Sequence, residues 1–209
     1  VYTIVIAILA TIISTVAGTL AAIGLSRSRK ALRNVVEQVN NLPIMNPEIV
    51  TAIGLLMFFS ALGINKGFTT LLLAHIMFCT PYVILSVSPK LRSLDPNLAD
   101  AALDLGATPM QALTKVIVPQ ITPGILSGAL IAFTMSIDDF VISYFTTGNG
   151  FETLPIRIYS MTKKTVTPKM YALATLIFFV ILILLLLSNL SDRDDKDPAR
   201  PRARRKLRL

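Results

Sequence analysis

The sequence predicts an all-α protein, a polytopic bundle of transmembrane helices that forms one domain over residues 1–190. Hydrophobic residues occupy 53% of the 209 positions, and the mean hydropathy is +0.66. Both values exceed those of soluble domains. Apolar runs of about 20 residues, the length that crosses a bilayer, also alternate with shorter charged segments. The chain is therefore expected in a membrane, with its polar stretches as loops.

Five apolar segments are long enough to be spans. They cover residues 1–25, 43–62, 68–87, 121–147 and 170–190. Glu48 is expected in the first turns of the second span, where the positive end of a helix stabilises a carboxylate. His75, the only histidine, lies in the third span. A packed and hydrogen-bonded role is favoured for His75, with a proton-carrying or ligand-binding role as the alternative.

Basic residues are distributed unevenly between the two sides of the membrane. Segments 26–42, 88–120 and 191–209 together hold 15 lysines and arginines, and the segments on the other side hold 5. Because cytoplasmic loops carry the excess of positive charge, the loop at about 88–120 and the tail are expected in the cytoplasm. The tail, residues 191–209, is charged and contains proline, so we expect disorder, with its basic half on anionic membrane lipid. This distribution of the net charge of +8 argues against nucleic acid as a partner.

The loop itself predicts two short helices. Asp95-Pro96 is a typical helix start, so a helix is expected from about residue 96 to residue 105. Gly106 follows where a left-handed residue commonly ends a helix. Thr108-Pro109 then starts a second helix by the same combination of cap and proline.

Seven residues of the loop lie at characteristic distances from one another along the chain. The positions are Asp100, Ala101, Ala102, Gly106, Val116, Val118 and Pro119. This spacing resembles the EAA loop of ABC-importer permeases, from which the sequence departs by Asp for Glu, Val for Ile and Val for Leu. In that family the first helix of the loop docks into a cleft of a cytoplasmic ATPase subunit. The resemblance implies that this helix, which also contains Asp104, couples the chain to ATP hydrolysis.

Two carboxylates interrupt the fourth span. Asp138 and Asp139 each cost about 2.5–3.5 kcal/mol within a bilayer, so both need a partner, water or a cation. In a continuous helix Asp139 shares a polar stripe with Ser136 and Ser143, and Asp138 points about 100° away. We interpret the pair as a negative lining for a cationic solute. The alternative is two structural carboxylates bonded to hydroxyl groups or to a neighbouring subunit.

Motifs around these carboxylates extend the resemblance over nearly the whole chain to about residue 190. Segments 136–143, 145–148, 153–156 and 47–50 resemble the permease subunits of spermidine/putrescine importers. That family implies a type I ABC-importer permease architecture in the bacterial cytoplasmic membrane. Its partners are ATP-binding subunits, a second permease subunit and an extracytoplasmic polyamine-binding protein. Its members usually have six spans, and this chain opens on Val1 without a methionine, so we expect the first span to be missing.

The predicted substrate path combines the carboxylates with neighbouring polar residues. Its members are Asp139, Asp138, Ser136, Ser143, Tyr144 and Glu48. No phosphate-binding loop, metal-ligand spacing or nucleophile triad is present in the sequence, so no catalytic residue, metal or cofactor is expected. Three alternatives stay open: an importer of another small solute, a secondary transporter or channel that works alone, and a membrane scaffold without a solute path.

Overall fold

A computed structural model describes residues 1–148 and 150–164, together with the single positions 168, 171, 172, 175, 176, 178, 179 and 182. The chain divides into two compact units, residues 1–159 and 160–209. The description below concerns the first. The predicted tail, and most of the predicted fifth span, lie outside the described residues.

The described part of the chain is all-helical, which confirms the predicted fold class. The helices are α1 (Tyr2–Ser26), α2 (Lys30–Met45), α3 (Glu48–Ala61), α4 (Phe68–Arg92), α5 (Leu98–Asp104), α6 (Pro109–Gln111), η1 (Ala112–Ile117), α7 (Val118–Asp138), α8 (Val141–Thr146) and α9 (Leu154–Lys164). By length and composition, three helical stretches of the described residues are able to cross a membrane: Tyr2–Ser26, Phe68–Arg92 and Pro109–Asp138. A fourth is added if α2 and α3 count as one bent span.

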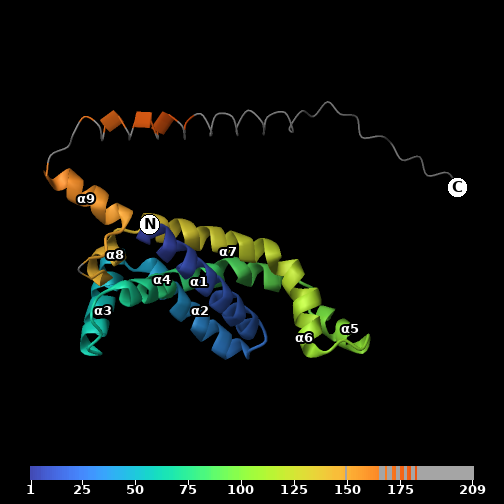
Figure 1. Cartoon of the computed structure of the whole chain (residues 1–209). Coiled ribbons are helices and arrows are strands. Elements are labelled where there is room, and N and C mark those ends of the chain that lie inside the picture. Colours follow the sequence, from blue (N-terminus) through green and yellow to red (C-terminus); the bar gives the residue numbers. More distant parts are fainter. Residues whose placement is uncertain are drawn as a thin grey trace. The chain divides into compact units, whose positions relative to one another are not determined.

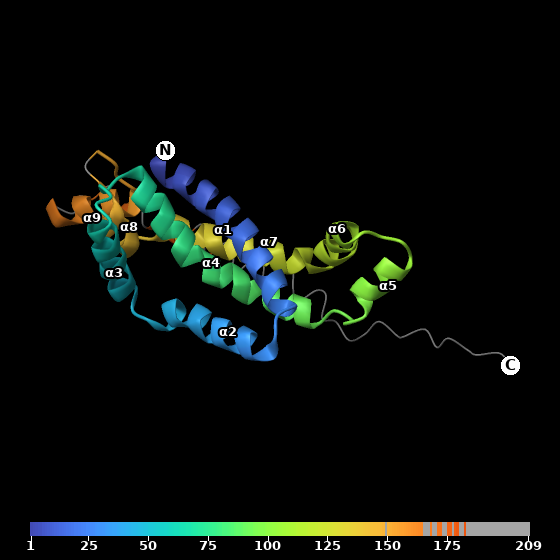
Figure 2. The ribbon, with the colours of Figure 1, turned by 90° about the horizontal axis from the view of Figure 1, so that it is seen from below.

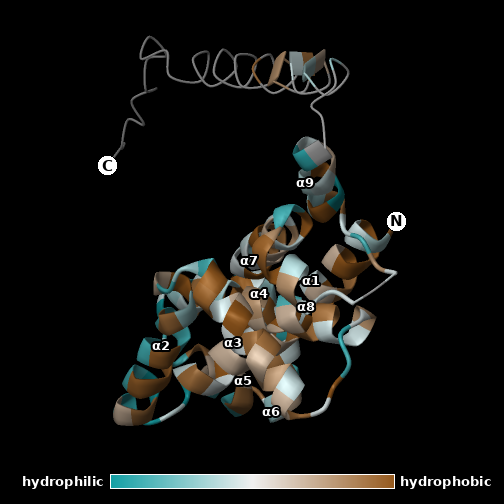
Figure 3. Ribbon diagram, turned by 90° about the vertical axis from the view of Figure 1, so that its left-hand side faces the viewer, coloured by the Kyte–Doolittle hydropathy of each residue, from teal (hydrophilic) through white to brown (hydrophobic). Residues whose placement is uncertain are grey.

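Helices α1, α4 and α7 form the core of the first unit and lie side by side (Figures 1 and 2). Figure 3 shows hydrophobic residues along all three. Small residues let the backbones approach closely: a Cβ added to Gly18 of α1 would lie 2.8 Å from Val83 Cβ of α4. Gly128 of α7 packs against the same valine, because an added Cβ there would lie 3.2 Å from Val83 Cα. Close backbone contact of this kind is a main source of helix association in membranes.

The second span differs from its prediction. The sequence predicts one helix over residues 43–62, whereas the structure has α2 and α3, bent by 106° at the break between them. Pro43 lies inside α2, and Asn46 is extended, with ψ 144°. The following Pro47 explains the bend, because a residue before proline avoids the helical conformation. Glu48 does occupy the first turn of α3, as predicted.

The polar loop has the predicted form with shifted ends. Helix α5 begins only at Leu98, because Asp95 Oδ1 accepts a hydrogen bond from the Asn97 backbone N–H (2.8 Å) and forms a turn first. Gly106 has φ +84°, the left-handed conformation expected there. Thr108 caps the next helix through its hydroxyl oxygen, which accepts from the Gln111 backbone N–H (3.3 Å). That helix runs on from α6 through the π-helical turn η1 into α7, so the fourth span starts earlier than the predicted residue 121.

A substitution that adds a single methyl group tests the close packing of Gly18. We expect Gly18→Ala to lower the stability of the chain by about 1–3 kcal/mol, because the new Cβ overlaps the stiff Val83 side chain. Gly24→Ala in the same helix is the matched control, since nothing lies within 4 Å of its added Cβ. Thermal unfolding in detergent measures both. Equal losses for the two variants would contradict the packing described here.

Candidate functional site

The fourth span is broken where its two carboxylates lie. The sequence predicts a continuous helix over residues 121–147, but α7 ends at Asp138 and Asp139 is extended, with φ −62° and ψ 121°. The Asp139 carboxylate accepts hydrogen bonds from the backbone N–H groups of Ile142 (Oδ1, 3.2 Å) and Ser143 (Oδ2, 2.7 Å). A side chain that binds backbone N–H groups competes with the helical bonds and starts a new helix. Asp139 therefore ends α7 and caps α8.

His75 of α4 lies against this break. Its Nδ1 is 2.7 Å from Ser136 Oγ in the last turns of α7, and its Nε2 is 3.0 Å from Ser143 Oγ in α8. The same Nε2 is 3.5 Å from Asp139 Oδ2, and both side chains are 1% exposed. The predicted packed and hydrogen-bonded role of His75 is thus what the structure shows. Ser136, Asp139 and Ser143 do lie together, as the predicted stripe required, but they surround His75 in the interior of the chain.

Asp138 and Glu48 lie on the outside of the same region. Asp138 is exposed at the end of α7, and Glu48 is exposed in the first turn of α3. Helix α3, which begins with Glu48, packs against α8, which follows Asp138 and Asp139 in the sequence. One buried and two exposed carboxylates therefore lie in neighbouring elements of the same region. Among the described residues, no group of three or more His, Cys, Asp and Glu side chains is arranged to hold a metal ion.

Three aromatic rings cluster around α8, which follows the two aspartates in the sequence. Tyr144 of α8 is 49% exposed, and its ring centroid is 5.4 Å from that of Phe140 and 6.3 Å from that of Tyr159. Phe140 and Tyr159 are themselves 4.6 Å apart. The sequence reasoning included Tyr144 and missed the other two. Phe140 was detectable from its i, i+4 spacing to Tyr144, whereas Tyr159 comes from α9 and had no local signal.

The loop residues lie at the other end of α7. Helices α5 and α6 lie away from α3 and α8 in both ribbon views (Figures 1 and 2). Asp100, Ala101, Asp104 and Gly106 are exposed, and Ala102 is half-buried. Pro119 is exposed in the first turn of α7. The 21 residues of α7 separate the loop from the carboxylates by about 30 Å at 1.5 Å per residue.

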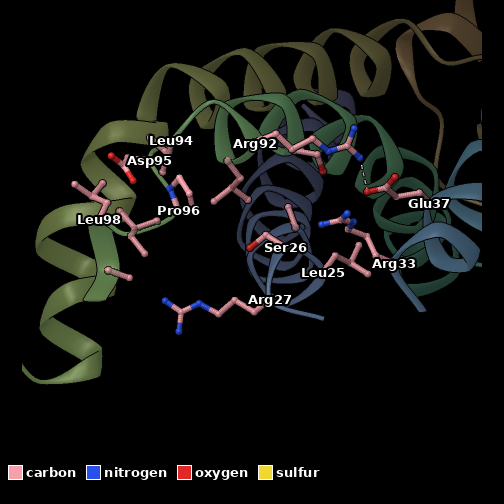
Figure 4. A pocket seen from close by; sticks show the side chains of 15 residues that line it. Leu25, Ser26, Arg27, Arg33, Glu37, Arg92, Leu94, Asp95, Pro96 and Leu98 are labelled. Atoms are coloured by element: carbon pink, nitrogen blue, oxygen red, sulfur yellow. Dashed lines mark hydrogen bonds and ion pairs between the residues drawn. The ribbon is translucent and has the colours of Figure 1, made fainter. Parts of the chain in front are cut away.

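A cavity of about 420 Å³ lies beside the start of the loop. Its walls come from the end of α1, from α2, from the end of α4 and from α5 (Figure 4). Arg92 of α4 donates a hydrogen bond to the Glu37 carboxylate of α2 across one side of it. This ion pair ties the bent second span to the helix that leads into the loop.

Comparison with known proteins places this architecture in a family. Residues 14–194 match the family described as "Binding-protein-dependent transport system inner membrane component". A crystal structure of an amino acid ABC transporter with histidines has the same fold, with a TM-score of 0.61 and 23% identity over 91% of this chain and 90% of that chain.

Curated relatives are more similar in sequence. The spermidine/putrescine transport system permease protein PotC of Haemophilus influenzae is 41% identical over 177 residues, which are 85% of this chain and 69% of that protein. PotC of Escherichia coli K12 is 42% identical over 164 residues, 78% of this chain and 62% of that protein. The putrescine transport system permease protein PotI of E. coli K12 is 41% identical over 167 residues, which are 77% of this chain and 59% of that protein. The chain thus spans about three fifths to two thirds of the length of these relatives.

The helical fold and the matched family lead to the same assignment. The chain belongs to the family of binding-protein-dependent transport system inner membrane components and is a transmembrane permease subunit of an ABC importer.

Proposed function

We propose that this permease moves polyamines, spermidine or putrescine, across the bacterial cytoplasmic membrane by alternating access. The observation that carries the proposal is that Asp138 and the buried Asp139 lie at a break in a membrane span, beside α3, which begins with Glu48 and packs against α8. Charged residues inside a membrane commonly mark solute pathways. Similarity to PotC and PotI supports the choice of solute.

The chemistry of the region suits a linear polycation. A polyamine carries ammonium groups separated by short alkyl chains, so it needs spaced carboxylates with apolar surface between them. Asp138 and Glu48 are exposed and would contact the ammonium groups. Tyr144 offers an aromatic face, and a cation over such a face gains about 0.5–2 kcal/mol. Asp139 would contribute negative potential from the interior, where the backbone N–H groups of Ile142 and Ser143 hold its carboxylate.

Helix α5 is the proposed contact for the cytoplasmic ATP-binding subunits. It exposes Asp100 and Ala101, and its small side chains leave room for a partner surface. The loop joins α4 directly and continues without a break from Pro109 to Asp138. A displacement of the loop by the closing ATPase subunits would therefore reach the carboxylates along one continuous helical stretch, α6, η1 and α7. A second permease subunit would complete the path, and an extracytoplasmic binding protein would deliver the solute.

Two other functions make different predictions. An importer of another small solute would keep the same framework, and competition for uptake between putrescine, spermidine and unrelated solutes distinguishes it. A secondary transporter or channel would carry solute without an ATPase subunit, so transport by the chain alone, reconstituted in vesicles, would favour it.

The proposed path predicts that charge, not shape, matters at its exposed carboxylates. We expect Asp138→Asn and Glu48→Gln each to lower putrescine uptake about tenfold, because a charge-assisted hydrogen bond contributes about 1.5–3 kcal/mol. Glu152→Gln is the control, since Glu152 is exposed but lies beyond α8. Uptake of labelled putrescine by vesicles that contain the partner subunits measures all three. Full uptake by the double variant D138N/E48Q would refute this path.

The turn after α5 provides a second test. Gly106 and Gly63 both have positive φ, +84° and +68°, and neither has an atom within 4 Å of an added Cβ. Valine at either position pays about 1–2 kcal/mol or more in backbone strain. We expect only Gly106→Val to uncouple ATP hydrolysis from uptake, because only that turn shapes the proposed contact with the ATPase. Comparable uncoupling by Gly63→Val would show that strain alone is responsible.

Orientation is testable with single cysteines. Cys79 is 0% exposed, so it is a silent background for labelling. We expect a membrane-impermeant maleimide to label Asn65→Cys in intact spheroplasts and Ser93→Cys only in inside-out vesicles, because the excess of basic residues places the loop in the cytoplasm. The opposite pattern would put α5 out of reach of any cytoplasmic motor.

A further inference from the structure

We infer that His75 is a positioning residue that holds the break between α7 and α8, and thereby sets the direction in which Asp138 and Tyr144 face the solute. The second half of this inference rests on the proposed function. The first half concerns the structure of this subunit alone.

His75 bridges both sides of the break. One ring nitrogen contacts Ser136 before it and the other contacts Ser143 after it, at 2.7 and 3.0 Å. These partners lie 61 and 68 residues from His75 in the sequence. The two halves of the fourth span are therefore fixed to each other through α4, the span on the other side of the loop.

The Asp139 carboxylate determines how the histidine is used. With the proton on Nε2, the Nε2–H group donates to Ser143 Oγ. The same N–H group lies 3.5 Å from Asp139 Oδ2, so the carboxylate faces a donor. Its Nδ1 then accepts from the Ser136 hydroxyl. The opposite tautomer would turn a lone pair towards the carboxylate in a site closed to water, which costs free energy. His75 thus supplies the carboxylate with its contact from outside the fourth span.

This contact reaches the solute region through the backbone. Asp139 uses its two oxygens to hold the N–H groups of Ile142 and Ser143, so its orientation fixes the start of α8. Asp138 is the preceding residue and Tyr144 lies in the second turn of α8. A carboxylate that loses its histidine would rotate or take up water, and both neighbours would change direction with it.

Asparagine and glutamine at position 75 test the inference, because both carry an amide group but their side chains differ in length. An asparagine amide at position 75 reaches about as far as Nδ1, whereas a glutamine amide reaches about as far as Nε2. We expect His75→Gln to keep the contact with Asp139 and Ser143, and His75→Asn and His75→Ala to lose it. Cys79→Ala is the matched control for a loosened core, because Cys79 is buried one turn further along α4 and contacts Ala132.

The primary measurement is amide hydrogen exchange over residues 140–146 in the purified complex with its partner subunits. We expect protection to fall about tenfold or more in His75→Ala and His75→Asn, since the buried carboxylate is left without its partner. His75→Gln and Cys79→Ala should keep the original protection. Unchanged protection in His75→Ala, or equal rescue by asparagine and glutamine, would overturn the positioning role. This measurement requires no solute.

The second measurement is putrescine uptake in vesicles that contain the partner subunits. We expect the apparent KM to rise about tenfold in His75→Ala while the maximal rate changes little, because the contact sets the solute site and not the coupling loop. A lower maximal rate with unchanged KM would overturn the link to solute binding. Failure of the unchanged chain to take up putrescine would reject the proposed function alone, since hydrogen exchange still decides the role of His75.

Discussion

The arrangement of this permease depends on the Asp139 carboxylate, which accepts hydrogen bonds from two backbone N–H groups inside a membrane span. Within a bilayer every backbone polar group needs a partner, and a helix interrupted there is tolerated only where the freed groups find one. Asp139 provides it for Ile142 and Ser143. The interruption gives the two adjacent carboxylates different environments, because Asp139 turns inward to His75 while Asp138 stays exposed.

The helices around α4 fix the position of the break at Asp139 relative to the polar loop. Helix α4 contacts α1 and α7 through glycines that leave no space for even one added carbon at Gly18. The same helix carries His75 and, at its end, Arg92, whose ion pair with Glu37 links α2 to the end of α4 from which the loop starts. Contacts at both ends of α4 therefore join the region of the carboxylates to the surface proposed for the ATPase.

Fold and solute are separate questions in this family. The amino acid ABC transporter shares the architecture at 23% identity, so the architecture alone does not select a polyamine. The side chains at the break supply that choice in our proposal: two exposed carboxylates, one buried carboxylate and the aromatic group around Tyr144.

The sequence by itself determined what depends on composition and local backbone preference. Apolar length gave the spans at α1 and α4, Gly106 gave the left-handed turn, and Thr108 with Pro109 gave the next helix start, because these properties act within a few residues. The bend before α3 is also local, because it lies at Asn46-Pro47, although the second span is predicted as one helix. Tertiary structure decided the break at Asp139 and the aromatic partner Tyr159. The sequence predicts a continuous helix over residues 121–147 because apolar residues continue on both sides of the break. What stabilises it is a histidine 61 and 68 residues away, a contact that only the packing of α4 against α7 and α8 creates.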